Sequence, residues 1–388
     1  MKSFDAIVIG GGASGFLCAI SAAKRGKRVA ILEHSLKPLR KVEVSGGGRC
    51  NFTNLNVSSD NYVSKDANRI KKALLEFSNR DFIKILEKNR IGYEEKHKGQ
   101  LFCSKGANAI SSALLSEAKG VDIYLGTKVI DVNKEGELFV VKTDKDCFFA
   151  SSVVVATGGL SYSKIGASGF GYEVAKKFGV NVVECEPSLV SVVLKDELLA
   201  EIADLQGVSV PAAVMIKGKY FRDDVLFTHF GMSGPLILQA SLYWNKGETF
   251  EIDMLPDVDI KKVIKEHRES SKGKKICKVL ETYLPKRIAQ FVTKEIDCFV
   301  TEISNKNIDE IEKRIKHFKI KPKGTYGFEG AEVTRGGVDI REINDESFEC
   351  IDVKGLFFVG EVLDVAGQLG GYNLQWAWSS GYCAGVHL

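Results

Sequence analysis

The first 33 residues of the chain switch between two hydrophobic periods. An apolar run from Asp5 to Gly10 predicts a short buried strand, and residues 16–24 have the apolar character and spacing of a helix. A second apolar run, residues 28–33, predicts another strand that ends on an acidic side chain. Strand, glycine-rich turn, helix and strand in this order predict a βαβ unit.

The rest of the pattern predicts further helices and strands. Helical periodicity marks the charged stretch 66–89 and the stretch 106–119. Strand-like runs are predicted at 101–104, 121–129, 138–143, 147–150 and 152–159. A second group of strand-like runs follows Pro187, at 189–194, 208–216 and 220–227. Residues 261–316 are mostly helical, and 355–361 with 376–387 return to a strand followed by a helix.

We therefore predict three parts. Residues 1–187 and 327–388 form a nucleotide-binding domain, because both contain the strand–turn–helix pattern. Residues 188–258 and 318–326 form an inserted β-rich module, and residues 259–317 form a helical module.

The turn after the first strand contains Gly10, Gly12 and Gly15. In the dinucleotide-binding fingerprint the first glycine permits the tight turn and the second lets the backbone approach a pyrophosphate. The third glycine lets the helix pack closely on the strand. The helix that follows this turn would present N–H groups and a positive dipole end to the phosphates.

Glu33 ends the second strand. An acid in this place accepts hydrogen bonds from an unphosphorylated ribose, which favours FAD or NAD over NADP. The alternative is a glycine-rich turn in an ordinary α/β protein. A second glycine cluster, residues 166–171, has no acid-terminated strand after it, so no separate NAD(P)H domain is predicted.

A second glycine-rich loop has the sequence Ser45-Gly46-Gly47-Gly48-Arg49-Cys50-Asn51. Three glycines in a row predict a backbone that lies flat against a ligand, and Lys41 and Arg49 would place cations beside a pyrophosphate. The alternative is a flexible surface loop. Cys50 could be a redox thiol, but no partner cysteine is spaced to exchange with it.

Composition narrows the classes of function. The 388 residues include 54 Lys and Arg against 50 Asp and Glu, a net charge of +4, which gives no case for nucleic acid or an anionic membrane. The basic stretch 261–278 lacks interleaved aromatic residues and favours a solvated face. Glycines interrupt the uncharged stretch 6–23, which argues against a signal peptide or a membrane span. We expect a cytoplasmic protein with a small-molecule substrate and with no nucleic-acid or membrane partner; its oligomeric state stays open.

Cysteine and histidine usage adds two expectations. The nine scattered cysteines include no Cys-x-x-Cys pair, which argues against a disulfide framework or an iron–sulfur cluster. The six histidines show no zinc spacing, so no metal site is predicted.

Several motifs carry a family likeness. They are Gly10–Gly15, Lys41 with Ser45–Asn54, Ala156–Gly159, Thr228–Pro235, Thr334–Val338 and Gly360–Asp364 with Gly370–Trp376. In these stretches the chain resembles the BaiN-like and aminoacetone-oxidase-like (YhiN-like) FAD-binding flavoproteins. The resemblance implies an α/β fold, with a Rossmann-type, glutathione-reductase-like FAD-binding domain interrupted by a β-barrel-like module and a small helical module. It also implies non-covalent FAD and oxidoreductase activity, on substrates as diverse as aminoacetone-type amines and conjugated steroid ketones.

The motifs and the resemblance together predict a set of FAD contacts. The set is Gly10, Gly12, Ala13, Ser14, Gly15, Glu33, Lys41, Ser45, Gly46, Gly47, Arg49, Cys50, Asn51, Val129, Thr157, Gly158, Gly159, Gly360, Glu361, Asp364, Gly371, Tyr372, Asn373 and Leu374. The backbone at the start of the last helix, Tyr372–Leu374, is expected to stabilise negative charge on the reduced flavin ring. Glu361 or Asp364 would bind the ribityl or pyrophosphate region, although Glu361 could instead be a helix-capping acid.

The expected activity is that of a FAD-dependent oxidoreductase that transfers hydride through flavin N5 to or from a small metabolite. It would reduce a conjugated ketone with NAD(P)H as a transient donor, or oxidise an amine with O₂. The alternatives are a flavoprotein acting on a macromolecule such as RNA, and a FAD-binding sensor without turnover.

Two residues are candidates for catalysis. His229 could donate a proton, and Arg335 could hold a carbonyl or carboxylate of the substrate. A structural histidine that caps the turn and a salt-bridged arginine are the alternatives.

Overall fold

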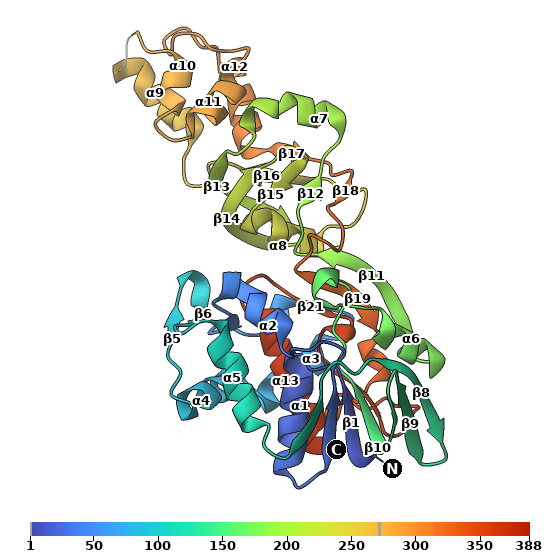
Figure 1. The fold of residues 1–388 in the computed structure, drawn as a ribbon. Helices are drawn as coiled ribbons and strands as arrows, with labels where there is room; N and C mark the ends of the chain where they lie inside the picture. Colours follow the sequence, from blue (N-terminus) through green and yellow to red (C-terminus); the bar gives the residue numbers. More distant parts are fainter. Residues whose placement is uncertain (1, 271–272) are drawn as a thin grey trace. The chain divides into compact units, whose positions relative to one another are not determined.

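The computed structural model describes residues 2–270 and 273–388, which form two compact units (Figure 1). The nucleotide unit consists of the residues up to Ser188 together with Ala331–Leu388, and the inserted unit is Leu189–Gly330. Among the described helices, none has both the length and the apolar character that a membrane crossing requires.

A mixed, seven-stranded sheet forms the centre of the nucleotide unit. Its five parallel strands are β1 (Lys2–Ile9), β2 (Val29–Leu32), β7 (Val121–Tyr124), β10 (Cys147–Val155) and β20 (Leu356–Phe358). β7, β2, β1 and β10 lie side by side in that order, and β20 pairs with β10. Their carboxyl ends meet at one edge, which is where α/β sheets bind ligands. The predicted Rossmann-type α/β fold is confirmed.

Two predicted features of the strands differ from the observed structure. The predicted runs 147–150 and 152–159 form one strand, β10, which ends at Val155. The run 121–129 is not continuous: β7 ends at Tyr124, and β8 (Val129–Glu135) forms an antiparallel meander with β9 (Leu138–Thr143) that joins the same sheet at β10. The break follows from Gly126, whose φ of +57° turns the chain out of the extended conformation.

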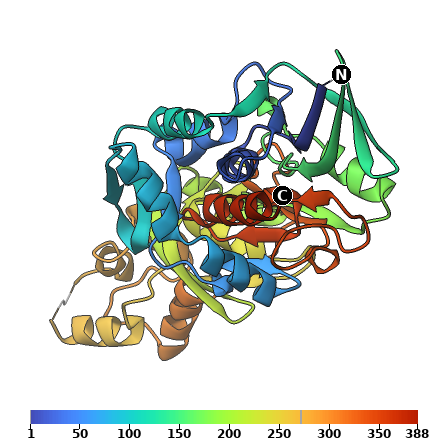
Figure 2. The same cartoon turned by 90° about the horizontal axis from the view of Figure 1, so that it is seen from below.

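Helices α1 (Ala13–Lys24) and α13 (Tyr372–His387) lie side by side, as Figure 2 shows in blue and red. Two glycines of α13 permit this approach. A Cβ on Gly381 would lie 2.3 Å from the Ser14 carbonyl oxygen, and one on Gly385 would lie 2.4 Å from that of Cys18. The chain's last helix is therefore held against the helix that follows the glycine turn.

The charged stretch 66–89 forms two helices, α3 (Ala67–Glu76) and α4 (Asn79–Lys88), and α5 (Ala107–Glu117) follows. Asp66 caps α3 by accepting from two backbone N–H groups, and Ser78 with Asp81 forms a capping box on α4. The other elements of the nucleotide unit include α2 (Arg40–Val44), β3 (Asn51–Asn54), β4 (Tyr62–Ser64), β5 (Tyr93–Glu95), β6 (Gln100–Cys103), α6 (Phe170–Lys177), β11 (Val182–Ser188), β19 (Val333–Val338) and β21 (Val365–Gly367).

The inserted unit contains an antiparallel sheet with the order β17-β16-β13-β14-β15-β12-β18. Its strands are β12 (Val192–Val193), β13 (Ser209–Ile216), β14 (Lys219–Phe227), β15 (Gly231–Ser233), β16 (Phe250–Asp253), β17 (Phe318–Ile320) and β18 (Gly324–Thr325). Its helices are α7 (Asp196–Glu201), α8 (Pro235–Tyr243), α9 (Ile260–Ser270), α10 (Ile276–Leu280), α11 (Lys286–Thr293) and α12 (Asn305–Lys316).

The inserted unit has one shared core. Val214 and Phe227 of the sheet belong to the same buried cluster as Ile264, Ile288 and Ile311 of the helices. The β-rich and helical modules that the hydrophobic pattern separates therefore pack as one body.

Candidate functional site

The glycine turn connects β1 to α1 and leaves an open space above the helix. Gly10 has a φ of +111°, and a Cβ there would lie 2.4 Å from the Ala156 carbonyl oxygen; one on Gly15 would lie 2.1 Å from that of Gly10. Both positions exclude a side chain because backbone fills the space. Gly12 differs, since no atom lies within 4 Å of its Cβ position. It is also the N-cap of α1 and provides no side-chain cap, so the first-turn N–H groups remain available for an anion.

Glu33 lies beside this turn. One carboxylate oxygen accepts a hydrogen bond from the Gly11 N–H at 2.7 Å, and the other accepts from the Ser35 N–H at 2.7 Å. The Glu33 carbonyl oxygen accepts from Thr127 N at 2.9 Å. This hydrogen bond holds the start of the meander, including buried Val129, at the carboxyl-end edge of the sheet where Glu33 lies. A carboxylate in this place can accept hydrogen bonds from ribose hydroxyls.

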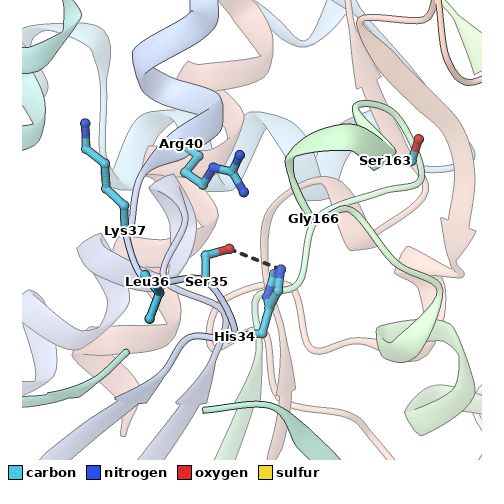
Figure 3. Close-up of a pocket in the computed structure, with 7 residues that line it drawn as sticks. All are labelled: His34, Ser35, Leu36, Lys37, Arg40, Ser163 and Gly166. Atoms are coloured by element: carbon cyan, nitrogen blue, oxygen red, sulfur yellow. Dashed lines mark hydrogen bonds between the residues drawn. The ribbon is translucent and has the colours of Figure 1, made fainter. Parts of the chain in front are cut away.

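A cavity of about 540 Å³ opens directly after Glu33 (Figure 3). Its lining residues are His34, Ser35, Leu36, Lys37, Arg40, Ser163 and Gly166. The Ser35 hydroxyl and the His34 ring are 3.2 Å apart, and the Arg40 guanidinium donates to the Ile165 carbonyl oxygen at 3.3 Å. None of these residues was predicted. The only sequence signal is their position after an acid-terminated strand, which in Rossmann domains is the adenosine side.

The end of β10 carries an unsatisfied hydroxyl. Within the part of the chain that the structure describes, Thr157 Oγ1 is buried and has no hydrogen-bond partner. The next residue, Gly158, has a φ of +73° and no atom within 4 Å of its Cβ position. Gly159 is packed tightly, with a Cβ position 2.5 Å from Thr334 Oγ1. A buried polar atom without a partner, beside an open position, is what a bound polar ligand would satisfy.

The loop 45–51 is folded tightly and is tied to α13. Gly46 and Gly47 have φ angles of +56° and +65°, a conformation that glycine adopts without strain. With its amide oriented to satisfy its neighbours, Asn51 accepts from the Gly371 N–H at 3.1 Å. Burial raises the pKa of the Cys50 thiol to about 12, which makes a reactive thiolate unfavourable.

Other residues of this loop have local roles. The Ser45 hydroxyl donates to the Val42 carbonyl oxygen at 2.7 Å. The Arg49 guanidinium is exposed and lies 5.5 Å from the centroid of the Phe102 ring.

Lys41 and Glu361 form an ion pair, with Lys41 Nζ 2.5 Å from Glu361 Oε2. Ser161 joins both side chains: it accepts from Lys41 at 3.1 Å and donates to Glu361 at 2.9 Å. The Thr334 N–H donates to Glu361 Oε1 at 2.9 Å, the oxygen that also accepts from Ser161. Nearby, burial raises the pKa of the Glu332 carboxyl while the Lys41 charge opposes that rise. The motifs identified Lys41 and Glu361 as cofactor contacts. They missed Ser161, and they included Thr334 only as the first residue of the Thr334–Val338 motif, with no role assigned to it.

The C-terminal segment, from β20 to the start of α13, places Gly360 and Gly371 at the carboxyl-end edge of the sheet. A Cβ on Gly360 would lie 2.5 Å from Ser14 Oγ, at the start of α1. Gly371 is the N-cap of α13 with a φ of +95° and no side-chain cap. By their position in the first turn, the N–H groups of Asn373 and Leu374 have no acceptor within the helix.

The side chains of Asn373 and Asp364 brace loops. Asn373 accepts from the Gly367 N–H at 2.7 Å and donates to the Gly367 carbonyl oxygen at 2.9 Å. Asp364 accepts from the Gly336 N–H at 3.1 Å, and burial raises the pKa of its carboxyl.

The two catalytic candidates lie in different units. Arg335 belongs to β19 of the nucleotide unit and forms an ion pair with Glu186, as the salt-bridge alternative requires. His229 belongs to the inserted unit; it is exposed, and its ring meets that of Phe230 edge-on at 5.1 Å.

The residues present fit a dinucleotide such as FAD. The space above Gly12, the uncapped start of α1 and the unpartnered Thr157 hydroxyl suit a pyrophosphate and its neighbours. Glu33 supplies the acceptor that a ribose needs.

Comparison with known proteins agrees with this geometry. Residues 4–387 match the family described as HI0933-like protein Rossmann domain. The chain is 40% identical over 394 residues to ribosomal RNA dihydrouridine synthase from Escherichia coli (strain K12), with 100% of this chain and 98% of that protein covered. It is 29% identical over 399 residues to 3-dehydro-bile acid delta(4,6)-reductase from Clostridium scindens, with 97% of each covered.

A solved structure shares the fold. The 3-ketosteroid-delta4-(5alpha)-dehydrogenase from Rhodococcus jostii RHA1 superimposes with a TM-score of 0.51 at 14% identity, covering 99% of this chain and 97% of that one.

Proposed function

The chain belongs to the HI0933-like family of FAD-dependent oxidoreductases, and we propose that it reduces uridine in ribosomal RNA to dihydrouridine. One observation carries the proposal: the 40% identity to ribosomal RNA dihydrouridine synthase runs through the whole length of both proteins. The substrate would thus be a base within a macromolecule, as in the alternative that the motifs left open.

The expectation that nucleic acid is not a partner is wrong, since the relative just named acts on RNA. That expectation rested on the net charge of +4, which averages over the whole chain. Residues 259–317 contain 15 Lys and Arg against 10 Asp and Glu, whereas the remainder has 39 against 40. A small total charge therefore hides a basic segment.

The names of the two relatives described above, the dihydrouridine synthase and the bile acid reductase, describe the same type of reaction. Dihydrouridine is uridine with its C5–C6 double bond reduced, and a delta(4,6)-reductase also removes carbon–carbon double bonds. In uracil this double bond is conjugated to the C4 carbonyl, so reduction adds a hydride at C6 and a proton at C5. This chemistry supports the expected reduction of a conjugated carbonyl compound, with a different substrate.

FAD in its reduced form supplies a hydride from N5 when it is bound. We assign the pyrophosphate to the N–H groups at the start of α1 and the adenosine ribose to Glu33. The N–H groups of Asn373 and Leu374 would stabilise negative charge on the flavin ring. NADH or NADPH would be the electron donor.

The chain's own residues must also supply a proton and hold the base. His229 stays the candidate for the proton at C5, because an exposed imidazole can donate a proton. Arg335 is the candidate for holding the C4 carbonyl oxygen, for which its ion pair with Glu186 would have to rearrange.

The test uses FAD-loaded protein, NADH or NADPH, and unmodified ribosomal RNA transcripts, with nucleosides quantified by mass spectrometry. The proposal predicts a nucleoside two hydrogen atoms heavier than uridine, formed only when protein, donor and transcript are all present. A conjugated steroid ketone serves as the competing substrate. Reduction of the ketone with no dihydrouridine in any transcript would contradict the proposal.

A further inference from the structure

Three aromatic side chains gather at the surface of the inserted unit. The rings of His229 and Phe230 meet edge-on at 5.1 Å, and those of Phe230 and Tyr326 lie 4.8 Å apart at 42°. Tyr326 is 53% exposed, so part of its ring remains accessible to a stacking partner.

The sheet brings these residues together from distant parts of the chain. β12 lies between β15 and β18, so it joins the segment of Phe230 to that of Tyr326. Leu194 N donates to the Phe230 carbonyl oxygen at 3.1 Å on one side of β12, and Tyr326 N donates to the Ser191 carbonyl oxygen at 2.9 Å on the other. The aromatic cluster is therefore held by backbone hydrogen bonds.

A row of lysines leads to this cluster. Lys319 in β17 is exposed, and so are Lys321 and Lys323, which follow the end of this strand at Ile320. Lys323 N donates to the Val193 carbonyl oxygen at 2.8 Å, so Lys323 pairs with the same side of β12 as Tyr326 does. Lys319 lies 3.7 Å from Glu251. Within residues 2–270 and 273–388, Lys321 and Lys323 have no carboxylate at ion-pair distance.

Edge protection explains the lysines alone but not the whole arrangement. β17, which contains Lys319, and β18, which follows Lys323, are both edge strands, and exposed lysines at an edge discourage pairing with other chains. Edge protection does not require an exposed tyrosine stacked on a second aromatic ring. Exposed aromatic rings beside unpaired cations are the recurrent means of binding single-stranded nucleic acid, since rings stack on bases and cations pair with phosphates.

We propose that Tyr326, Phe230 and His229, with Lys321 and Lys323, bind a single-stranded segment of RNA, with a base stacked on Tyr326 and phosphates held by the two lysines. This inference rests on the proposed function for the identity of the nucleic acid. It assigns the aromatic residues a role in substrate binding and leaves the choice of the reacting base to other contacts.

Fluorescence anisotropy of a labelled, uridine-containing single-stranded RNA oligonucleotide tests the proposal on the FAD-loaded, full-length protein. Tyr326→Ala is expected to weaken binding about 5- to 150-fold, because base stacking on an aromatic ring is lost. Tyr326→Phe, which retains the ring, is expected to bind as the wild type does. The double variant Lys321→Ala with Lys323→Ala should lower the slope of log affinity against log salt by about 1.4.

A charge-matched control is available on α9. Lys262 and Lys265 are exposed and, within the described ranges, also have no carboxylate at ion-pair distance, so Lys262→Ala with Lys265→Ala removes the same charge elsewhere. An equal decrease in the slope of log affinity against log salt for the two double variants would overturn the assignment. It would indicate that lysines anywhere on the surface contribute equally to RNA binding. Wild-type protein that does not bind the oligonucleotide, or a Tyr326→Ala variant that binds like wild type, would overturn it too.

Measuring dihydrouridine with the same proteins separates this inference from the proposed function. Weak binding by Tyr326→Ala, with no dihydrouridine formed by any protein, would support this surface and contradict the proposed function. Normal dihydrouridine formation by Tyr326→Ala at an unchanged KM would support the function and contradict the surface.

Discussion

Lys41 Nζ lies 2.5 Å from Oε2 of Glu361, although 320 positions separate the two residues in the sequence. Glu361 has a side chain that is only 17% exposed, and it also accepts from Ser161 and from the Thr334 N–H. The pair therefore links the segment after β2 to the segment after β20, at the edge where the cofactor is proposed to bind.

Lys41→Ala would leave the Glu361 carboxylate without its cation. We expect the free energy of unfolding to fall by about 1–2 kcal/mol, less than for a fully buried pair because Lys41 is 38% exposed. Urea unfolding of the FAD-free protein measures it. Lys84→Ala, which removes an exposed partner of Asp81, is the control and should cost at most about 0.5 kcal/mol. Equal effects of the two substitutions would contradict the account of the Lys41–Glu361 pair.

Two glycines of the same turn should respond differently to substitution. Gly12→Leu adds a side chain where no atom lies within 4 Å, so the FAD-free protein should fold and melt like wild type yet fail to retain FAD. Gly15→Ala forces a Cβ to within 2.1 Å of the Gly10 carbonyl oxygen and should lower the melting temperature itself. Visible flavin absorbance per mole of protein and thermal melts distinguish the two. Full flavin content in Gly12→Leu would refute the pyrophosphate assignment.

Glu117 predicts a dependence of stability on acid. Hydrogen bonds from Lys24 and Lys88 lower the pKa of its carboxyl to about 2, from an ordinary 4.5. Because the folded-state pKa is depressed, the stabilisation is fully present above pH 4.5 and is lost as the pH falls toward 2.

Glu117→Gln should therefore lower the free energy of unfolding at pH 7 by about 1–2 kcal/mol, a value reduced by the exposure of both lysines. The difference in the free energy of unfolding between the variant and the wild type should shrink as the pH falls from 4.5 to 2. Denaturant unfolding across this range measures it, and a difference that stays constant would count against the pair.

His229→Ala should lower kcat for dihydrouridine formation by about 10²- to 10⁴-fold, the usual effect of removing a general acid. Reduction of the flavin by NADH or NADPH in the absence of RNA should be unaffected. His317→Ala, at an exposed histidine of the same unit, is the control. Turnover by His229→Ala equal to that of the control would remove His229 from the catalytic candidates.

The parts of the fold that were predictable are those encoded by consecutive residues. The strand, the turn with Gly10, Gly12 and Gly15, the helix and the acid at Glu33 all lie within one short stretch, and each has a local physical reason. The structure shows the reasons directly: backbone fills the Cβ positions of Gly10 and Gly15 and leaves that of Gly12 open.

The parts that were not predictable depend on distant residues. Ser161 and Thr334 complete the polar cluster around Glu361. Thr334 begins the Thr334–Val338 motif, but nothing in this motif indicates that its N–H reaches Glu361, and Ser161 lies outside every motif. The aromatic cluster of Phe230 and Tyr326 requires β12 to lie between two strands that are far apart in the sequence. The expectation against nucleic acid failed for a related reason, since an average charge does not report where the charges lie.

The central claim is tested most directly by expressing this chain in an Escherichia coli strain that lacks its own ribosomal RNA dihydrouridine synthase. Mass spectrometry of nucleosides from the purified ribosomal RNA gives the readout, and Gly12→Leu, expressed to the same level, is the inactive control. The account predicts that the wild-type chain restores dihydrouridine in the ribosomal RNA and that Gly12→Leu does not. Ribosomal RNA without dihydrouridine, despite an abundant and FAD-loaded wild-type protein, would contradict it.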